Sequence, residues 1–414
     1  VLAQSTFRRF YLIGRTLDRA GKLGNPVPAR RGKRESKAYR QEAGMQREIH
    51  GGNVYGREVR LDFSVNINPL GMPQGVRQAI TEYTAWDETY PDIECTDLRR
   101  AIAQKEGIAP EQILCGNGAS ELLMAVVRAT APEKCAIAAP SFSGYERAVR
   151  AAGAEPVFYE LSHDTGFGYE TVCDRLSKMT VQMLFLCNPN NPTGNTIPEQ
   201  ILTEILQFCA SKKIRVVADE CFLRFHPHYE KMSCKRFLKQ YPNLLIVNAF
   251  TKFYAMAGLR LGYMMTGDLS LLHAVAQQLP EWNVSSIAQR AGISALKDTE
   301  YEKRTRQLIE KERRYLIQEF LKMGFYFGFG GVVTFKNAKK AVEAVEAIPI
   351  EKILLETDCP YMAPEPNRGK RNYSGYLPYV AERIAQIKQM TAQEVIDITN
   401  ANARKLFGLS AVQD

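Results

Sequence analysis

Between residues 112 and 278 the sequence alternates short apolar runs with longer amphipathic ones, and this alternation constrains the fold most strongly. Strands are predicted at 112–115, 135–139, 155–161, 183–187, 214–218, 243–248 and 261–266. Helices are predicted at 119–131, 143–152, 197–212 and 269–278. The pattern predicts an α/β fold with a mostly parallel sheet that is covered on both faces. Such sheets bind ligands on the loops beyond the carboxyl ends of their strands.

Further helices are predicted on either side of this region. Two shorter ones are expected at 74–83 and 97–105, and a long charged helix is expected at 302–322. We expect the long helix to leave the sheet domain and to pack in a second domain. The chain has 414 residues, which at roughly 100–200 residues per domain corresponds to two or three domains.

The positive charge of the chain is concentrated at its beginning. The formal net charge is +9, and residues 1–44 hold eleven Lys and Arg against three Asp and Glu, a net of +8. The remaining residues carry only +1, so the main body is expected to have no basic face, and no nucleic-acid partner is expected. Residues 1–44 are basic and contain two prolines, so they are expected to form a disordered extension, with a functional arm as the alternative. No apolar core of signal-peptide length follows their charges.

Cysteine usage and hydropathy bear on the compartment. The nine cysteines are odd in number, scattered, and never spaced Cys-x-x-Cys. This usage predicts a cytoplasmic protein without a disulfide framework or a zinc site. No run of 18 or more apolar residues exists, so no membrane span is predicted.

The segment from 248 to 263 lies between two predicted strands and carries the residue types of a covalent cofactor site. Lys252 would be held near low dielectric, which disfavours its charged form and makes its amine nucleophilic. Arg260 keeps its charge and suits a phosphate, and Gly258 and Gly262 let the backbone approach a ligand closely. Together with Thr251, these residues suit a carbonyl cofactor that bears a phosphate. On this segment alone, a solvated lysine on an ordinary turn is an equal alternative.

Further groups that suit an aromatic aldehyde phosphate follow other predicted strands. Ala119 and Ser120 begin a predicted helix whose free N–H groups would bind an anion, although an ordinary helix cap is the alternative. Asn191 offers a positioned amide in a rigid proline turn, and Phe142 could stack on an aromatic ring. Asp219 ends a buried strand, where a carboxylate needs a cation or a donor. Opposite a pyridine nitrogen, this carboxylate would keep that nitrogen protonated.

Four motifs, taken in this order, resemble fold-type I pyridoxal-phosphate enzymes of the aminotransferase class I/II family over residues 45 to about 324. The motifs are Gly116-x-Gly-Ala-Ser-Glu, Asn188-Pro-Asn-Asn-Pro-Thr-Gly, Asp219-Glu-Cys-Phe and Thr251-Lys-x5-Gly-Leu-Arg-x-Gly-Tyr. In combination they are highly specific. The resemblance implies the large domain of that fold and pyridoxal 5'-phosphate as the cofactor.

The resemblance implies a role toward the cofactor ring for four residues. Lys252 would bond to the aldehyde carbon of the cofactor, and Asp219 would pair with the pyridine nitrogen. Asn191 would bond the ring hydroxyl, and Phe142 would stack on the ring. Phe222 departs from the family, because many relatives have a tyrosine there that also bonds the ring hydroxyl.

The resemblance also assigns the cofactor phosphate. The residues that would hold it are Ala119, Ser120, Thr251 and Arg260. Tyr90, in the Tyr-Pro-Asp turn, would reach the phosphate of the neighbouring subunit's cofactor, so a homodimer is implied. Ala249 stands where many relatives place a serine or threonine on the phosphate.

Within the family, the opening motifs resemble the threonine-phosphate decarboxylases of cobalamin synthesis. These motifs are His50-Gly-Gly-Asn and Asp62-Phe-Ser-x-Asn-Ile-Asn-Pro-Leu-Gly. The implied reaction converts L-threonine O-3-phosphate to aminopropanol phosphate, and a histidinol-phosphate-type aminotransferase is the alternative. The decarboxylase must align the Cα–carboxylate bond perpendicular to the cofactor ring, whereas the aminotransferase must align Cα–H there. The sequence leaves open which bond is aligned.

The residues after 326 resemble a different family, the TatD-type metal-dependent hydrolases, over about 327–410. The matching segments are 324–338, 353–361, 368–372 and 398–408. Asp358 would be a remnant metal ligand there, but the five histidines of the chain all lie outside this region. A lone carboxylate is not a catalytic metal site, and part of a barrel cannot close its sheet. We therefore predict a TIM-barrel-derived fragment, joined near 324–326, and no metal site.

These resemblances predict the domain organisation 1–44 (extension), 45–85 (N-terminal arm and start of the small domain), 86–285 (cofactor-binding large domain), 286–326 (small-domain helix region) and 327–414 (TatD-like fragment). The small domain is then incomplete, and the arginine expected for the substrate carboxylate is replaced. Two further hypotheses follow, a metal-dependent DNase supplied by the tail and an inactive chimera that binds the cofactor without turnover.

Overall fold

The computed structural model describes residues 51–409, except 53, 57–58, 60–61, 63, 84–87, 162–167, 336–337, 358, 360–361 and 369. The predicted basic extension and Asp358 therefore lie outside the described residues. Backbone contacts separate residues 12–66 from a unit that includes residues 67–414. In the smaller unit, Ser64 Oγ accepts a hydrogen bond from the Gly52 N–H over 2.8 Å and donates to Asp62 Oδ1 over 2.5 Å.

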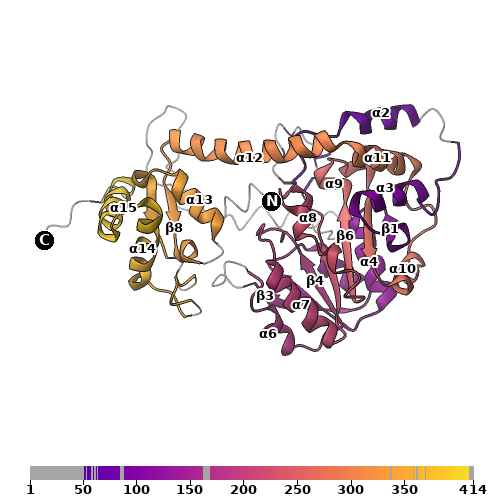
Figure 1. Ribbon diagram of the computed structural model, residues 1–414, viewed down its shortest axis with the longest axis horizontal. Helices are drawn as coiled ribbons and strands as arrows, with labels where there is room; N and C mark the ends of the chain where they lie inside the picture. The colour runs from indigo at the N-terminus through magenta and orange to yellow at the C-terminus, as the bar shows by residue number, and fades with distance from the viewer. Residues whose placement is uncertain are drawn as a thin grey trace. The chain divides into compact units, whose positions relative to one another are not determined.

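The larger unit contains a seven-stranded sheet (Figure 1). Its strands are β1 (Ile113–Gly116), β2 (Lys134–Ala139), β3 (Glu155–Glu160), β4 (Met183–Cys187), β5 (Arg215–Asp219), β6 (Leu244–Ala249) and β7 (Gly262–Thr266). The spatial order is β1-β7-β6-β5-β4-β2-β3, and only β7 runs antiparallel to its neighbours in this sheet. The predicted mostly parallel α/β sheet is confirmed, with every strand end within one residue of its expected position.

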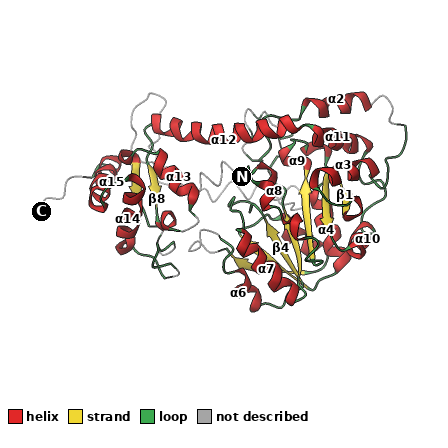
Figure 2. Cartoon of the chain, viewed as in Figure 1, coloured by secondary structure: helices red, strands yellow, loops and turns green. Residues whose placement is uncertain are grey.

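Helices cover both faces of this sheet, as Figure 2 shows. Successive strand residues alternate between two cores, so that Ile246 belongs to one core and Val247 to the other. This period-2 alternation is what a strand buried on both faces requires. The first core includes residues of α3 (Thr96–Glu106), α7 (Glu199–Ser211) and α11 (Ser286–Lys297). The second includes residues of α4 (Ala119–Thr130), α5 (Gly144–Ala151) and α10 (Leu269–Ala276).

Shorter helices complete this part of the chain. They are α2 (Gln74–Tyr83), which packs on α11, and α6 (Val172–Ser177), α8 (Tyr229–Met232) and α9 (Phe250–Phe253). In addition, α11 contributes Ala288, Ala291 and Ala295 to the same core as the sheet. Among the described residues, no helix has the combination of length and apolar character that a bilayer crossing needs.

The long helix α12 (Thr299–Lys322) connects two hydrophobic cores. Its first turn is capped by Asp298, whose side chain accepts from the Tyr301 N–H over 2.9 Å. Tyr301 belongs to the first sheet core, whereas Ile317, Phe320 and Leu321 pack against a third core farther along the chain. The observed helix ends at the predicted residue, Lys322, and begins at Thr299, before the predicted start at 302. Its packing in a separate second domain stays a prediction.

The C-terminal segment (residues 327–409) has its own core. Two short parallel strands, β8 (Phe327–Phe329) and β9 (Ile353–Leu355), flank α13 (Lys339–Ala347), and α14 (Leu377–Lys388) and α15 (Ala392–Phe407) follow. A parallel strand–helix–strand unit is also the repeat of a TIM barrel. The barrel-derived origin of this segment stays a prediction, as do the domain boundaries.

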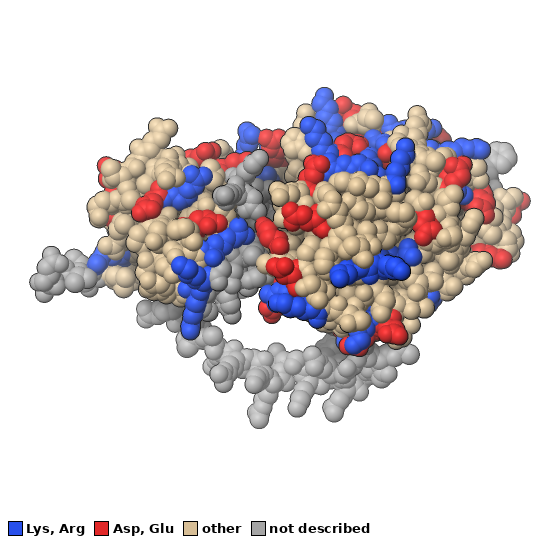
Figure 3. Space-filling view, turned by 60° about the horizontal axis from the view of Figure 1, so that its bottom comes forward, with Lys and Arg blue, Asp and Glu red and all other residues tan. Residues whose placement is uncertain are grey.

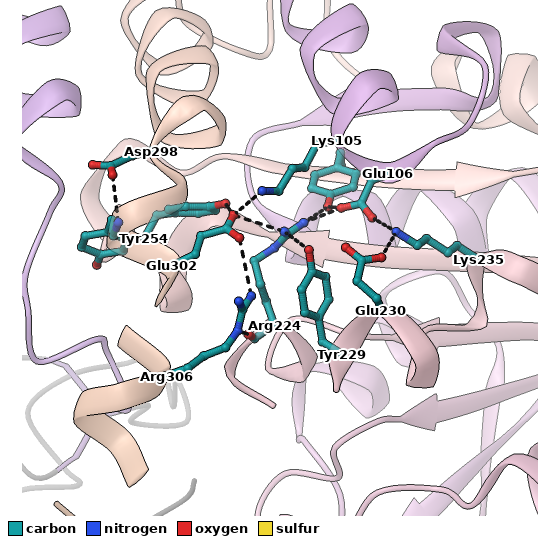
Figure 4. A network of polar contacts seen from close by, with 12 residues as sticks. Lys105, Glu106, Arg224, Tyr229, Glu230, Lys235, Tyr254, Asp298, Glu302 and Arg306 are labelled. Atoms are coloured by element: carbon teal, nitrogen blue, oxygen red, sulfur yellow. Dashed lines mark hydrogen bonds and ion pairs between the residues drawn. The ribbon is translucent and has the colours of Figure 1, made fainter. Parts of the chain in front are cut away.

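A buried ionic network joins α3 to the segment that follows β5 (Figure 4). Glu106 is paired with the guanidinium of Arg224, and it accepts from Lys235 Nζ over 3.0 Å and from the Tyr263 hydroxyl over 2.7 Å. Although burial raises the pKa of Glu106, the charges of Arg224 and Lys235 hold it below its ordinary value. The carboxylate is therefore ionised and fully partnered in the interior.

The same network reaches the first turn of α12 through Glu302. Its Oε1 accepts from Lys105 Nζ over 2.8 Å and from the Tyr254 hydroxyl over 2.6 Å, and it lies 3.5 Å from Arg224 Nη1. Arg306, one turn later, lies 3.5 Å from the other carboxylate oxygen. Two helices and the loop after β5 are thus tied together by charges that are mostly shielded from water.

Candidate active site

The register of the sheet aligns the starting points of the predicted site loops. Gly262 of β7 is opposite Gly116 on one side and opposite Ala249 on the other. Farther along the same edge, Asp219 of β5 is opposite Cys187 of β4. The loops that carry Ser120, Lys252 and Asn191 therefore leave the sheet at the same edge, which is where α/β sheets bind ligands. 

Close backbone packing brings the start of α4 next to Arg260. Gly118 has a left-handed φ of 84°, and a Cβ there would lie 2.7 Å from Arg260 Nη2. A Cβ at Gly262 would lie 2.7 Å from the backbone nitrogen of Ala119. Gly118 is the N-cap residue of α4 and provides no side-chain cap. The first N–H groups of α4, beside a guanidinium, therefore offer the donors that an anion would need.

Other residues predicted at the phosphate lie on the same loops. Ser120 is exposed in the first turn of α4, and Thr251 is half-buried in α9. Arg260 has a left-handed φ of 54°, and its exposed guanidinium donates to the Ala257 carbonyl over 3.4 Å. This set offers backbone N–H groups, hydroxyls and a permanent cation, which are the donors that a phosphate monoester requires.

Lys252 lies within α9, directly after β6. Its side chain is half-buried, and its Nζ lies 5.7 Å from the centroid of the Phe222 ring. Burial lowers the pKa of Lys252, and the charge of Arg260 lowers it further, while Cys221 and Asp219 act in the opposite direction. A larger share of this amine is therefore neutral and nucleophilic than for a lysine in water.

Asp219 is held at the end of β5 by two donors. Its side chain is 7% exposed, and its Oδ2 accepts from the Tyr145 hydroxyl over 2.7 Å. Its Oδ1 accepts from the Cys221 N–H over 3.0 Å. Burial raises the pKa of Tyr145, and the charge of Asp219 raises it further, so the hydroxyl remains a donor. The sequence analysis missed Tyr145, although it stands three residues after Phe142 in the same segment.

A buried amide links the Phe142 loop to the Asn191 loop. Asn190 is fully buried, and its Nδ2 donates to the Pro140 carbonyl over 3.1 Å and to Thr193 Oγ1 over 2.9 Å. The Phe142 ring contacts Tyr145 edge-on, with centroids 5.5 Å apart. The sequence predicted a cofactor-facing amide at Asn191 but did not predict that Asn190 joins the two loops. The consecutive asparagines at 190 and 191 were the pattern that could have indicated it.

Tyr90 lies on the surface and forms an aromatic stack. It is 78% exposed, and its ring centroid lies 4.5 Å from that of Trp282. Asn283, the next residue, donates to Glu121 Oε2 over 2.7 Å, and Glu121 also accepts from the Asn117 N–H over 2.6 Å. The stack is thus tied to the first turn of α4. Contact of Tyr90 with a neighbouring subunit stays a prediction.

The residues present fit pyridoxal phosphate. One edge of the sheet brings together three features: a helix start whose N–H groups suit an anion, a half-buried lysine of lowered pKa, and a buried carboxylate that accepts a hydrogen bond from Tyr145. Phe222 also lies beside Lys252, so this position supplies a ring face and no hydroxyl. Within the described ranges, no group of three or more His, Cys, Asp and Glu side chains could hold a metal ion. The fold and the site define an enzyme of the pyridoxal-phosphate-dependent fold-type I class.

Comparison with known proteins gives the family. The model of the family "Aminotransferase class I and II" matches residues 58–360, so the chain belongs to this family. Its membership confirms the expected cofactor, pyridoxal phosphate. The crystal structure of the histidinol-phosphate aminotransferase from Clostridium acetobutylicum superimposes with a TM-score of 0.57 and 32% identity, covering 63% of this chain and 76% of that one.

Two decarboxylase relatives match over most of their length. The threonine-phosphate decarboxylase of Salmonella typhimurium is 30% identical over 323 residues, which are 75% of this chain and 88% of that protein. A protein of Caldanaerobacter subterraneus named for the same reaction, with the assignment marked as provisional, is 36% identical over 308 residues. That match covers 74% of this chain and 82% of the relative.

Proposed function

We propose that this enzyme decarboxylates a phosphorylated amino acid, with L-threonine O-3-phosphate as substrate and aminopropanol phosphate and carbon dioxide as products. The observation that carries the proposal is the match to two relatives named for this reaction over more than four fifths of their length. The motif that spans residues 62–71, which resembles these decarboxylases, agrees with it. A role in cobalamin synthesis follows from the same reaction.

Lys252 is the residue proposed to carry the cofactor. Its lowered pKa leaves a larger share of the amine neutral than in a lysine in water, and attack on an aldehyde carbon requires the neutral amine. Ala119, Ser120, Thr251 and Arg260 would hold the cofactor phosphate. When bound, pyridoxal phosphate supplies an electron sink for the electron pair left on the substrate Cα.

The remaining residues would orient the ring and maintain its charge. Asp219, held in place by Tyr145 and the Cys221 N–H, would hold a proton on the pyridine nitrogen. Asn191 would donate to the ring hydroxyl, and Phe142 would stack on one ring face. Because Phe222 has no hydroxyl, Asn191 would carry that hydrogen bond without help from residue 222.

The first experiment tests the cofactor site. Purified protein with added pyridoxal phosphate is expected to show a visible absorbance band that Lys252→Ala abolishes. Borohydride reduction followed by peptide mass spectrometry should then place the cofactor on Lys252. Wild-type protein that gives no band after cofactor addition would exclude this site.

The second experiment separates decarboxylation from transamination. Carbon dioxide release from L-threonine O-3-phosphate is expected, and keto-acid-dependent amino transfer from histidinol phosphate is not. The alternative is a histidinol-phosphate-type aminotransferase, which the 32% identical Clostridium structure supports. Amino transfer without carbon dioxide release would establish the alternative. Cofactor binding with neither activity would identify an inactive chimera, in which the incomplete small domain prevents turnover.

The assembly and the compartment are also proposals. The exposed Tyr90–Trp282 stack supports a homodimer in which Tyr90 reaches the partner's cofactor. All nine cysteines are free, which supports the cytoplasm. Figure 3 shows acidic and basic side chains interspersed on the face that it draws, in agreement with a small-molecule substrate rather than nucleic acid.

The TatD-like origin of the C-terminal segment rests on its sequence motifs and on its parallel strand–helix–strand unit. We expect no divalent-metal-dependent DNA cleavage, because the expected histidine ligands are missing from this segment. Cleavage that is lost in Asp358→Ala would show that the tail is a functional nuclease.

A further inference from the structure

The helix that carries Lys252 is too short to satisfy its own backbone. Because α9 has four residues, its carbonyl groups lack the i+4 N–H partners of a longer helix. Two of these carbonyls belong to Lys252 itself and to the next residue, Phe253. Buried carbonyls without partners are rare in folded proteins, so the donors that reach them determine how α9 is held.

Within the segment itself, the Ala255 N–H reaches the Lys252 carbonyl over 3.4 Å. Shorter bonds come from a turn that is distant in the sequence. The backbone N–H of Asn68 donates to the Lys252 carbonyl over 3.1 Å. The side-chain Nδ2 of the same residue donates to the Phe253 carbonyl over 2.7 Å and to Thr305 Oγ1 over 2.8 Å. Asn68 is 3% exposed and therefore makes these bonds away from water.

The turn itself is rigid. Asn68 Oδ1 accepts from the Leu70 N–H over 3.0 Å, and the Asn68 carbonyl accepts from the Gly71 N–H over 3.0 Å. Gly71 has a φ of 70°, a left-handed value that glycine adopts readily because it has no Cβ. The intervening proline, Pro69, fixes its own φ. The amide of Asn68 is thus presented to α9 in one orientation.

A second donor arrives from α12 and meets the first. The hydroxyl of Tyr301 lies 3.1 Å from the Phe253 carbonyl and 2.7 Å from the Gly71 carbonyl, to both of which it donates. Thr305, one turn later on α12, is fully buried against the Asn68 amide. The turn at 68–71 therefore lies between α9 and α12 and bonds to both.

We propose that Asn68 is a positioning residue for Lys252. Together with Tyr301, Asn68 clamps the carbonyls of Lys252 and Phe253 and so fixes the lysine amine in the half-buried site. This inference rests on the proposed role of Lys252 as the cofactor lysine. Three charged or titratable groups, Asp219, Cys221 and Arg260, also act on the amine. The clamp contributes no charge and acts by keeping α9 packed and its lysine shielded from water.

The experiment measures the titration of Lys252 in the full chain after removal of the cofactor. Trace acetylation with acetic anhydride at a series of pH values, followed by peptide mass spectrometry, gives the pH midpoint for this lysine. Asn68→Ser removes the amide, while its hydroxyl can still accept from the Leu70 N–H. Tyr301→Phe removes only the hydroxyl that donates to the Phe253 carbonyl. Because each variant loses one polar group and keeps the other donor, at least one of the two should stay folded.

Both variants are expected to move the Lys252 midpoint upward by about half a unit to one unit, because a loosened α9 admits water. Acetylation of Lys252 at neutral pH would then fall by about threefold to tenfold, since one unit changes the neutral fraction tenfold. Asn243→Ser is the matched control. Its amide also donates to a backbone carbonyl, that of Ile214, over 2.8 Å, at the opposite edge of the sheet.

Superimposable midpoints in wild type, Asn68→Ser and Tyr301→Phe would overturn the inference, because a merely structural role lowers stability without moving the titration. An equal shift in Asn243→Ser would overturn it too. Failure of the proposed function is a separate result. It would be seen in wild type alone, as cofactor that borohydride does not trap on Lys252.

Discussion

The hydroxyl of Tyr145 donates to Asp219 Oδ2 over 2.7 Å, which joins helix α5 to the carboxyl end of strand β5. Both side chains are buried, and the tyrosine ring is stacked on Phe185 with centroids 5.1 Å apart. The carboxylate proposed to face the pyridine nitrogen is therefore fixed by a donor that cannot rotate away. We therefore expect the affinity for the cofactor to depend on this pair.

We expect Tyr145→Phe to weaken binding of pyridoxal phosphate. The variant leaves Asp219 with the hydrogen bond from the Cys221 N–H and costs about 1.5–3 kcal/mol, the range for a hydrogen bond to a charged group. Affinity should fall by about tenfold to a hundredfold, measured by cofactor titration of the visible band.

Tyr159→Phe is the matched control for this prediction. Tyr159 is 2% exposed, and within the described part of the chain its hydroxyl has no hydrogen-bond partner. Removing an unpaired buried hydroxyl is expected to be neutral or stabilising. Equal losses of cofactor affinity in the two variants would show that the Tyr145 hydroxyl has no specific role.

Gly262→Ala is expected to damage the anion site. The added Cβ would lie 2.7 Å from the Ala119 nitrogen and 2.8 Å from the Gly118 carbonyl carbon, both backbone atoms that can move little. The start of α4 must then shift away from Arg260, and affinity for pyridoxal phosphate and for inorganic phosphate should fall at least tenfold. Gly258→Ala, where nothing lies within 4 Å, should bind both ligands as wild type does.

Glu106→Gln tests the buried network of Figure 4. The variant leaves Arg224 and Lys235 with an uncharged partner in the interior, and breaking a buried ion pair costs about 3–5 kcal/mol. Urea unfolding should report this loss. Glu310→Gln, which breaks an exposed pair with Arg314 on α12, should change stability by no more than about 0.5 kcal/mol. Similar effects of the two substitutions would contradict the assignment.

Glu220→Gln should change how stability depends on pH. Burial raises the pKa of Glu220 from 4.5 to about 7, against the opposing hydrogen bonds from Cys234 and Ser233. Between these values the folded state binds more protons than the unfolded state, so this residue lowers the free energy of unfolding as pH rises. The loss is complete above pH about 7 and amounts to about 3 kcal/mol.

The Gln variant has no such proton to lose. It should therefore match wild type near pH 4.5 and be more stable by up to about 3 kcal/mol at pH about 8, measured by urea unfolding across the range. Glu111→Gln, at an exposed carboxylate, is the control and should keep the wild-type profile. A constant difference between Glu220→Gln and wild type at all pH values would refute the role of Glu220.

The sequence was sufficient to predict the sheet, because each strand is a short apolar run between polar turns. It also predicted that Asp219 and Lys252 lie at the carboxyl-end edge of the sheet, because Asp219 ends one buried strand and Lys252 follows another. Their roles toward the cofactor stay predictions. The sequence did not predict Tyr145, which reads as an ordinary core residue on an amphipathic helix. The bond from Asn68 to Phe253 spans 185 positions, and the pair of Glu106 and Arg224 spans 118, so no local pattern indicates either.

The distribution of the nine thiols has a practical consequence. Six are buried and two are partly covered, which leaves Cys359, in the C-terminal segment, as the exposed one. Burial also raises the pKa of Cys135, Cys187 and Cys209 to about 12, so these react slowly as nucleophiles. A maleimide dye should therefore label the native chain at a single position. Fluorescence from that position would follow the C-terminal segment during cofactor binding without any engineered cysteine.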